Sequence, residues 1–120
     1  MYRDDEVRLR HMLDAAREAV SFAQGRTRGD LDDNRQLVLA LVKDIEIVGE
    51  AANQVSELGR RRLPELPWER IVGMRNRLVH AYFDIDLDIV WKTVAEDLPQ
   101  LISLLEAAIP SGPGTPPAAE

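Results

Sequence analysis

With 120 residues, the chain is long enough for one domain and too short for a second hydrophobic core. Hydrophobic residues make up 45% of the chain and aromatic residues only 5%, which favours helices packed on helices, and the absence of cysteine excludes disulfides, thiolate zinc sites and cysteine nucleophiles. The net charge of −6 argues against nonspecific nucleic-acid binding by the chain as a whole, because Lys and Arg carry the affinity for phosphate.

The first predicted helix covers residues 4–25. Its apolar residues recur at helical spacing and are Leu9, Met12, Ala16, Val20 and Ala23. Residues 2–10 are charged from the first turn, unlike a signal peptide, and no apolar run approaches the roughly 18 residues that span a bilayer. The sequence therefore predicts a soluble, cytoplasmic protein that does not associate with a membrane.

A longer second helix is predicted over residues 32–58, after aspartates that can cap it. Its apolar stripe consists of Leu41, Ile45, Val48, Ala52 and Val55, and a polar stripe beside it consists of Glu46, Glu50, Asn53 and Glu57. Gly59 lies where a left-handed residue commonly ends a helix. The arginines at 60–62 would then face the negative end of the helix dipole.

The third predicted helix begins at Pro67 or Trp68 and continues to about Tyr82. A proline is tolerated in the first turn because its missing N–H has no partner there. Aspartates between residues 84 and 88 interrupt the helical pattern and can cap the next helix.

The fourth helical segment is predicted over residues 87–109, and Pro99 should kink it or start a new helix with its cap near Asp97. The predicted fold is therefore an all-α, up-and-down bundle of four helices, or of five if Pro99 divides the last. It would occupy residues 1–109, and the Pro- and Gly-rich residues 110–120 would form a disordered tail.

The segment from Arg75 to Tyr82 concentrates side chains suited to RNA cleavage. A neutral His80 can accept the proton of a 2′-hydroxyl, and an imidazolium can donate one to the leaving 5′-oxygen. Arg75 can hold the scissile phosphate, and Asn76 can orient the imidazole or bind phosphate or base. The substrate supplies its own nucleophile, so this chemistry needs no metal ion and no cofactor.

The charge and the geometry of this segment each allow more than one interpretation. Six arginines against two glutamates in residues 60–77 could attract an anionic ligand or simply form a solvated basic face. Arg75 and His80 lie roughly 140° apart on an ideal helix, so the arginine wraps round, the helix loosens near its end, or a second subunit completes the site. We favour a symmetric dimer. An ordinary helix end with a partly buried, hydrogen-bonded histidine is the alternative, and His11 is interpreted as a surface or packing residue.

The spacing Arg75-x4-His80-x-Tyr82 resembles the R-x4-H-x-Y signature of HepT proteins in the HEPN superfamily. Residues 47–53, 66–68 and 97–99 are similar to the family as well. The resemblance extends over residues 4–109. It implies a compact helical bundle that forms a homodimer, with the two R-x4-H segments meeting in a cleft.

The resemblance also implies a function. Many such proteins act as metal-independent endoribonucleases and serve as the toxin of a toxin–antitoxin pair, and Arg75 and His80 would then be catalytic in this chain. Asn76 would be auxiliary, and Glu50 would line the cleft unless it is a solvated acid. The antitoxin would be an MNT-type nucleotidyltransferase that transfers AMP to Tyr82, where bulk and negative charge would exclude RNA. A non-catalytic binding module modified by such an enzyme is the alternative, and a purely structural dimer is a third possibility.

Overall fold

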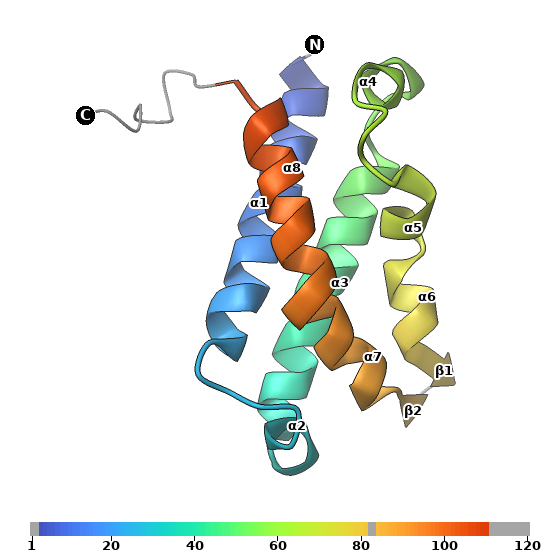
Figure 1. Cartoon of the computed structure of the whole chain (residues 1–120). Helices are drawn as coiled ribbons and strands as arrows, with labels where there is room; N and C mark the ends of the chain where they lie inside the picture. The colour runs from blue at the N-terminus through green and yellow to red at the C-terminus, as the bar shows by residue number, and fades with distance from the viewer. Residues whose placement is uncertain (1–2, 82–83, 111–120) are drawn as a thin grey trace, which may run out of the picture.

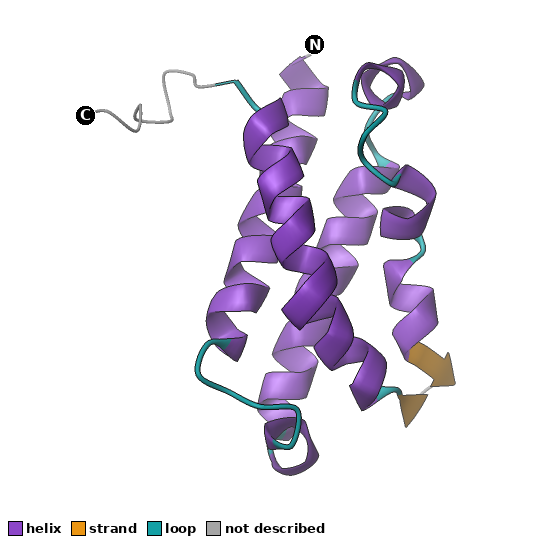
Figure 2. Ribbon diagram, in the orientation of Figure 1, coloured by secondary structure: helices purple, strands orange, loops and turns teal. Residues whose placement is uncertain are grey.

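The chain folds as an up-and-down bundle in which four helical rods run antiparallel to their neighbours in sequence (Figure 1). The computed structural model describes residues 3–81 and 84–110. Figure 2 shows that the rods are mostly helical, that loops join them at their ends, and that a small pair of strands lies at the end of the third rod. The predicted all-α bundle is therefore confirmed, whereas the predicted tail at 110–120 lies, apart from Pro110, outside the described residues.

The helices and strands follow one another in this order. The first rod is α1 (Arg3–Ala23), and the short α2 (Asp30–Asp33) leads into the second rod, α3 (Arg35–Asn53). The short α4 (Glu57–Arg62) leads to the third rod, which consists of α5 (Trp68–Val72) and α6 (Met74–Leu78). Strands β1 (Val79–Ala81) and β2 (Asp84–Ile85) pair antiparallel. The fourth rod comprises α7 (Leu87–Lys92), the π-helical η1 (Thr93–Asp97) and α8 (Leu98–Ala108).

The core lies where α1, α3 and the fourth rod meet. Its fully buried side chains include Leu9, Met12, Leu41, Ile45, Val48, Val94, Leu98 and Leu105. Burying each such side chain contributes about 1.5–3 kcal/mol, so these contacts dominate the stability of the bundle. The apolar stripes predicted for the first two helices are confirmed as core, except that Val20 and Ala23 are only partly buried and pack against it. No helix in the described part of the chain is long and apolar enough to cross a membrane.

Helix α3 occupies the centre of the bundle, with α1 on one side and the third rod on the other (Figure 1). Gly49 makes the close approach of the third rod possible. An added Cβ at this position would lie 3.3 Å from the backbone carbonyl oxygen of Ile71. The third rod is thereby held directly against α3 at Gly49, and this contact positions α6.

The predicted end of the second helix is wrong, because α3 stops at Asn53 and not near residue 58. Ser56 begins α4 instead, and its side chain accepts a hydrogen bond from the backbone N–H of Gly59 at 3.0 Å. The buried Asp5 of α1 in turn accepts bonds from Ser56 N (2.8 Å) and Ser56 Oγ (2.6 Å). An added Cβ at Gly59 would lie 2.5 Å from Asp5 Oδ2, so this glycine serves close packing and not a left-handed turn.

Arg60 satisfies the C-terminal carbonyl groups of α3 although it belongs to α4. Its guanidinium donates to the carbonyl oxygens of Ala52 and Asn53 at 3.2 Å and to that of Val55 at 3.3 Å. The guanidinium also lies over the ring of Trp68, 5.7 Å from the centroid. The predicted meeting of a cation with the negative end of the second helix is confirmed for this arginine.

Two predicted features of the fourth rod are confirmed. Asp86 caps α7, since its side chain accepts from the backbone N–H of Ile89 at 3.1 Å. Pro99 lies in the first turn of α8, where a new α-helix starts after the π-helical turn of η1. Asp97 is the residue before this helix, but its carboxylate makes no cap bond and accepts from Arg70 at 3.4 Å instead.

Candidate functional site

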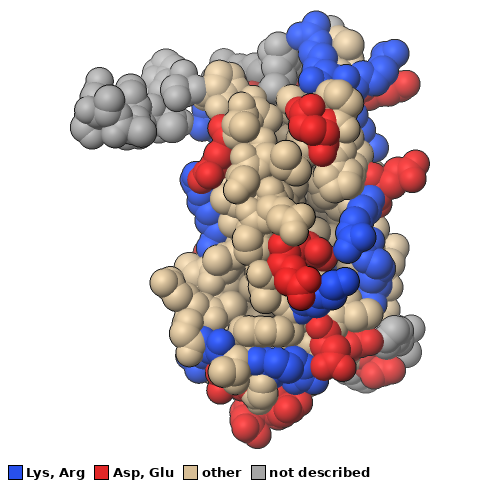
Figure 3. Space-filling model, viewed as in Figure 1, with Lys and Arg blue, Asp and Glu red and all other residues tan. Residues whose placement is uncertain are grey.

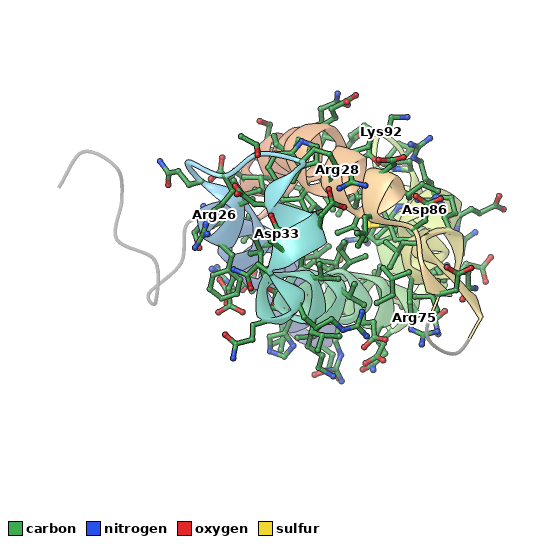
Figure 4. All side chains as sticks on the ribbon, turned by 90° about the horizontal axis from the view of Figure 1, so that it is seen from below. Arg26, Arg28, Asp33, Arg75, Asp86 and Lys92 are labelled. Carbon is green, nitrogen blue, oxygen red and sulfur yellow. The ribbon has the colours of Figure 1, made fainter. Side chains whose placement is uncertain are left out.

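Arg75 lies on α6 with its side chain directed to the second rod. Its Nε donates to a carboxylate oxygen of Glu46 on α3, and no other hydrogen bond of this guanidinium is present in residues 3–81 and 84–110. The arginine side chain remains 51% exposed, whereas that of Glu46 is 22% exposed. Figure 4, which views the bundle from the end where α2 and the strands lie, shows Arg75 at the edge of the molecule.

The Glu46 contact fixes one side of the guanidinium and leaves the other side available. An arginine that is held at Nε still presents its two terminal nitrogens, whose paired N–H groups match two phosphate oxygens. Lys43, on the same helix, approaches Glu46 at 4.0 Å and adds a second cation beside this carboxylate. The arrangement is suited to orient an arginine toward an anion in solvent.

His80 lies just beyond the end of α6, in β1, so the prediction of a helix continuing to Tyr82 is wrong. The third rod is interrupted at Gly73, and its helix ends at Leu78 because Val79 is extended (φ −120°, ψ 108°). The backbone N–H of Asp86 donates to the carbonyl oxygen of Leu78 at 2.7 Å, which holds the returning strand against the helix end.

The angle of roughly 140° between Arg75 and His80 assumed that both residues lie on one ideal helix. That angle does not apply, because Arg75 lies in α6 and His80 in β1. The sequence left three ways to bring the two side chains together: a wrapped arginine, a helix that loosens at its end, or a second subunit. Within a single chain, the backbone adopts the second, since the helix ends before His80. Tyr82, the predicted modification site, and Phe83 lie outside the described residues.

The two auxiliary residues predicted from the sequence lie at different places. Asn76 is exposed on α6, next to Arg75. Glu50 is exposed on α3 and lines a pocket of about 130 Å³ together with Arg8, His11 and Gln54. Among the described residues, no hydrogen bond or ion pair joins Glu50 to Arg75.

Glu46 is the residue that sequence reasoning missed. It belongs to the same polar stripe as Glu50, one helical turn earlier, and the stripe was the available signal. Which of its acids faces α6 depends on the register between α3 and the third rod, and the close contact at Gly49 sets that register. No local pattern in the sequence reports such a contact.

The arginines predicted as a basic cluster do not act as one group. Arg60 is engaged by carbonyl groups, and Arg70 is paired with Asp97. Arg77 donates to the backbone carbonyl oxygen of Arg70 at 3.0 Å. Figure 3 shows basic and acidic side chains interspersed over the face formed by α8 and the third rod, without a continuous basic surface there. Arg75 contacts Glu46 on α3, whereas Arg70 contacts Asp97 in the fourth rod and Arg60 contacts backbone carbonyl groups, so these arginines are directed to different places.

A family model and several individual relatives all match this chain to one protein family. A family model described as Ribonuclease HepT-like matches residues 12–108. A candidate RNase of Methanocaldococcus jannaschii is 33% identical over 99 residues, covering 82% of this chain and 91% of the relative. A candidate ribonuclease HepT of Thermococcus cleftensis is 36% identical over 93 residues, covering 74% and 84%.

A third relative, a candidate RNase of Caldanaerobacter subterraneus subsp. tengcongensis, is 31% identical over 93 residues, covering 78% of this chain and 83% of the relative. No solved structure matches the chain with comparable significance. The family model spans most of the chain and includes the segment that carries Arg75 and His80. The chain therefore belongs to the HepT-like family of the HEPN superfamily.

Proposed function

We propose that the chain is a metal-independent endoribonuclease of a toxin–antitoxin pair, with Arg75 and His80 as its catalytic residues. The main support for this proposal is the position of the Arg75 guanidinium. Glu46 holds it at Nε, while its terminal nitrogens stay available for an anion. This exposed arginine lies on the last short helix before β1, five residues before a histidine. The family and its relatives named as RNases support RNA as the substrate.

The reaction follows from these groups. His80 takes the proton of a ribose 2′-hydroxyl, and the freed oxygen attacks the adjacent phosphorus. The bond from phosphorus to the 5′-oxygen breaks, and a protonated His80 imidazolium donates the proton with which that oxygen leaves as a 5′-hydroxyl. The other product carries a 2′,3′-cyclic phosphate. Arg75 stabilises the negative charge that builds on the non-bridging oxygens.

A homodimer completes this proposal. The side chain of Arg75 is half exposed in one protomer, so solvent reaches a phosphate bound there and weakens its electrostatic interactions. A second copy related by a two-fold axis would cover the site and bring a second Arg75–His80 pair to the same cleft.

Removing either catalytic side chain should lower RNA cleavage in EDTA by about a hundredfold or more. The assay compares the purified wild-type chain with Arg75→Ala and His80→Ala. Arg61→Ala is the matched control, because Arg61 is exposed on α4 and makes no hydrogen bond or ion pair in the described structure. Equal cleavage by wild type, Arg75→Ala and His80→Ala would remove the catalytic proposal and favour a non-catalytic binding module.

The proposed partner is a nucleotidyltransferase antitoxin of the MNT type, with Tyr82 as the acceptor of AMP. Incubation with this enzyme, ATP and Mg²⁺ should raise the mass of the chain by one or more AMP units. Tyr82→Phe should abolish the increase, whereas Tyr2→Phe, which changes the other tyrosine of the chain, should retain it. Intact mass spectrometry measures the outcome, and an unchanged increase in Tyr82→Phe places the modification elsewhere.

A further inference from the structure

A second polar pocket lies between α1 and α3, away from the Arg75 contact. It has a volume of about 250 Å³. The residues that line it are His11, Asp14, Ala15, Glu18, Asp44 and Ile47. The three polar residues from α1 are spaced three and four positions apart, so they share one face of that helix. Figure 1 shows α1 and α3 running side by side, which makes this pocket a feature of the central helix pair.

Asp44 is the unusual member of this pocket. It is 2% exposed, and its Oδ2 has no hydrogen-bond partner. Burial raises the pKa of Asp44 to about 7, with further contributions from the hydrogen bond and the charge of Glu18. A buried carboxyl oxygen without a partner is costly, because the protein does not replace the water that it loses.

The charges in the pocket are not balanced by a basic side chain. Within the described ranges, Asp14, Glu18 and Asp44 take part in no ion pair with Lys or Arg. The basic residues next in sequence to Asp44 and Glu18 are directed elsewhere, Lys43 to Glu46 and Arg17 to Glu106. His11 is the only lining group in the pocket that can carry a positive charge. Three acidic residues and one imidazole thus line this volume, with the Oδ2 of Asp44 buried in the pocket wall.

We propose that this pocket, the Asp44 pocket, binds an organic cation through an ammonium or guanidinium group. Such a group brings three to five N–H donors, which matches the acceptors of Asp14, Glu18 and Asp44. Ala15 and Ile47 provide apolar surface for the methylene stem that carries the charge. Among the described residues, no three His, Asp or Glu side chains are grouped so that they could hold a metal ion.

The shape of the surface next to the Asp44 pocket favours a ligand with more than one amino group. The smaller pocket of about 130 Å³ shares His11 and Ile47 with it and adds Glu50 as a further acid. Asp44 and Glu50 are six residues apart on α3, about 9 Å along the helix axis. A linear polyamine fits this spacing, and so does a pair of basic side chains from a partner protein.

Titration calorimetry with spermidine tests the proposal on the full chain. Wild type should bind at about pH 7 with release of protons, seen as heat that depends on the buffer, because the cation favours ionised Asp44. Asp44→Asn and Glu18→Gln should each weaken binding by about tenfold or more. Glu18 is exposed, so Glu18→Gln keeps the test independent of folding. Asp33→Asn, an exposed acid on α2, changes net charge equally and should bind as wild type.

The same experiment identifies the source of the cation. Spermidine bound more tightly than Nα-acetyl-arginine amide assigns the pocket to free polyamines, and the reverse order assigns it to a basic side chain of a partner. Equal weakening by Asp33→Asn, the same binding by MgCl2 at equal ionic strength, or no binding of either probe would overturn the proposal. RNA cleavage does not enter the readout, so the outcome is independent of the proposed ribonuclease activity.

Discussion

Glu46→Gln is expected to lower kcat for RNA cleavage by about tenfold to a hundredfold and to change KM much less. The carboxylate of Glu46 holds Arg75 at Nε, and a neutral amide holds it more weakly. A guanidinium that rotates freely still meets the phosphate of bound RNA by charge attraction. It loses the alignment with the oxygens on which charge builds in the transition state. Steady-state kinetics on a short RNA of defined sequence measures both constants.

Two further variants show whether Glu46 acts through Arg75. The double variant Glu46→Gln/Arg75→Ala should be no slower than Arg75→Ala alone, because the arginine that Glu46 positions is already absent. Glu57→Gln, an exposed acid on α4, should cleave RNA at the wild-type rate. Full activity in Glu46→Gln, or a double variant whose losses multiply, would contradict a positioning role.

The four rods could be predicted from the sequence because their information is local. Apolar residues at helical spacing define the buried face of each rod, and the buried positions of α1 and α3 follow those stripes. The caps were predictable for the same reason, as at Asp86, which precedes its helix directly. The start of α8 at Pro99 was predictable from that residue alone, because a proline has no N–H to donate and is tolerated in the first turn of a helix.

The breaks in the second and third helices could not be predicted, because distant residues cause them. Helix α3 ends early since Ser56 starts a new helix that Asp5, 51 positions away in the chain, holds by two hydrogen bonds. Gly59 has the right residue type for a helix end and is used for contact with Asp5 instead. The extended backbone at Val79 is stabilised by the returning strand β2, which a helical pattern does not reveal.

The candidate site was predictable in composition but not in geometry. The spacing of Arg75 and His80 is a property of the sequence, whereas the ion pair between Arg75 and Glu46 joins residues 29 positions apart. The Asp44 pocket is a similar case, since Glu18 and Asp44 come from separate helices. In each pair an acid acquires its role from a residue of the helix packed against its own.

Asp44→Asn is expected to make the protein more stable than wild type at about pH 8, by about 2 kcal/mol, and to make little difference at about pH 4. The pKa of Asp44 is raised from 3.8 to about 7 in the folded chain, so folding favours the protonated carboxyl group. As the pH rises above about 4, the unfolded chain loses this proton first, and wild-type stability falls until about pH 7. The full shift corresponds to about 4 kcal/mol, and sharing of charge with Glu18 reduces what a single variant recovers.

Urea unfolding at both pH values measures the difference in the free energy of unfolding between Asp44→Asn and wild type. The variant is expected to be the more stable protein because of the amide that replaces the carboxyl group. An asparagine keeps the size of Asp44, carries no charge, and can donate a hydrogen bond to the neighbouring Glu18 carboxylate, where Asp44 Oδ2 has no partner. Asp33→Asn, on exposed α2, should leave the pH dependence as it is in wild type. If Asp44→Asn were less stable than wild type at both pH values, the carboxyl group would be a packing element of the bundle. If Asp44→Asn is more stable than wild type only at high pH, the ionised Asp44 carboxylate destabilises the wild-type fold. Such a cost is expected of a residue that serves to bind a cation.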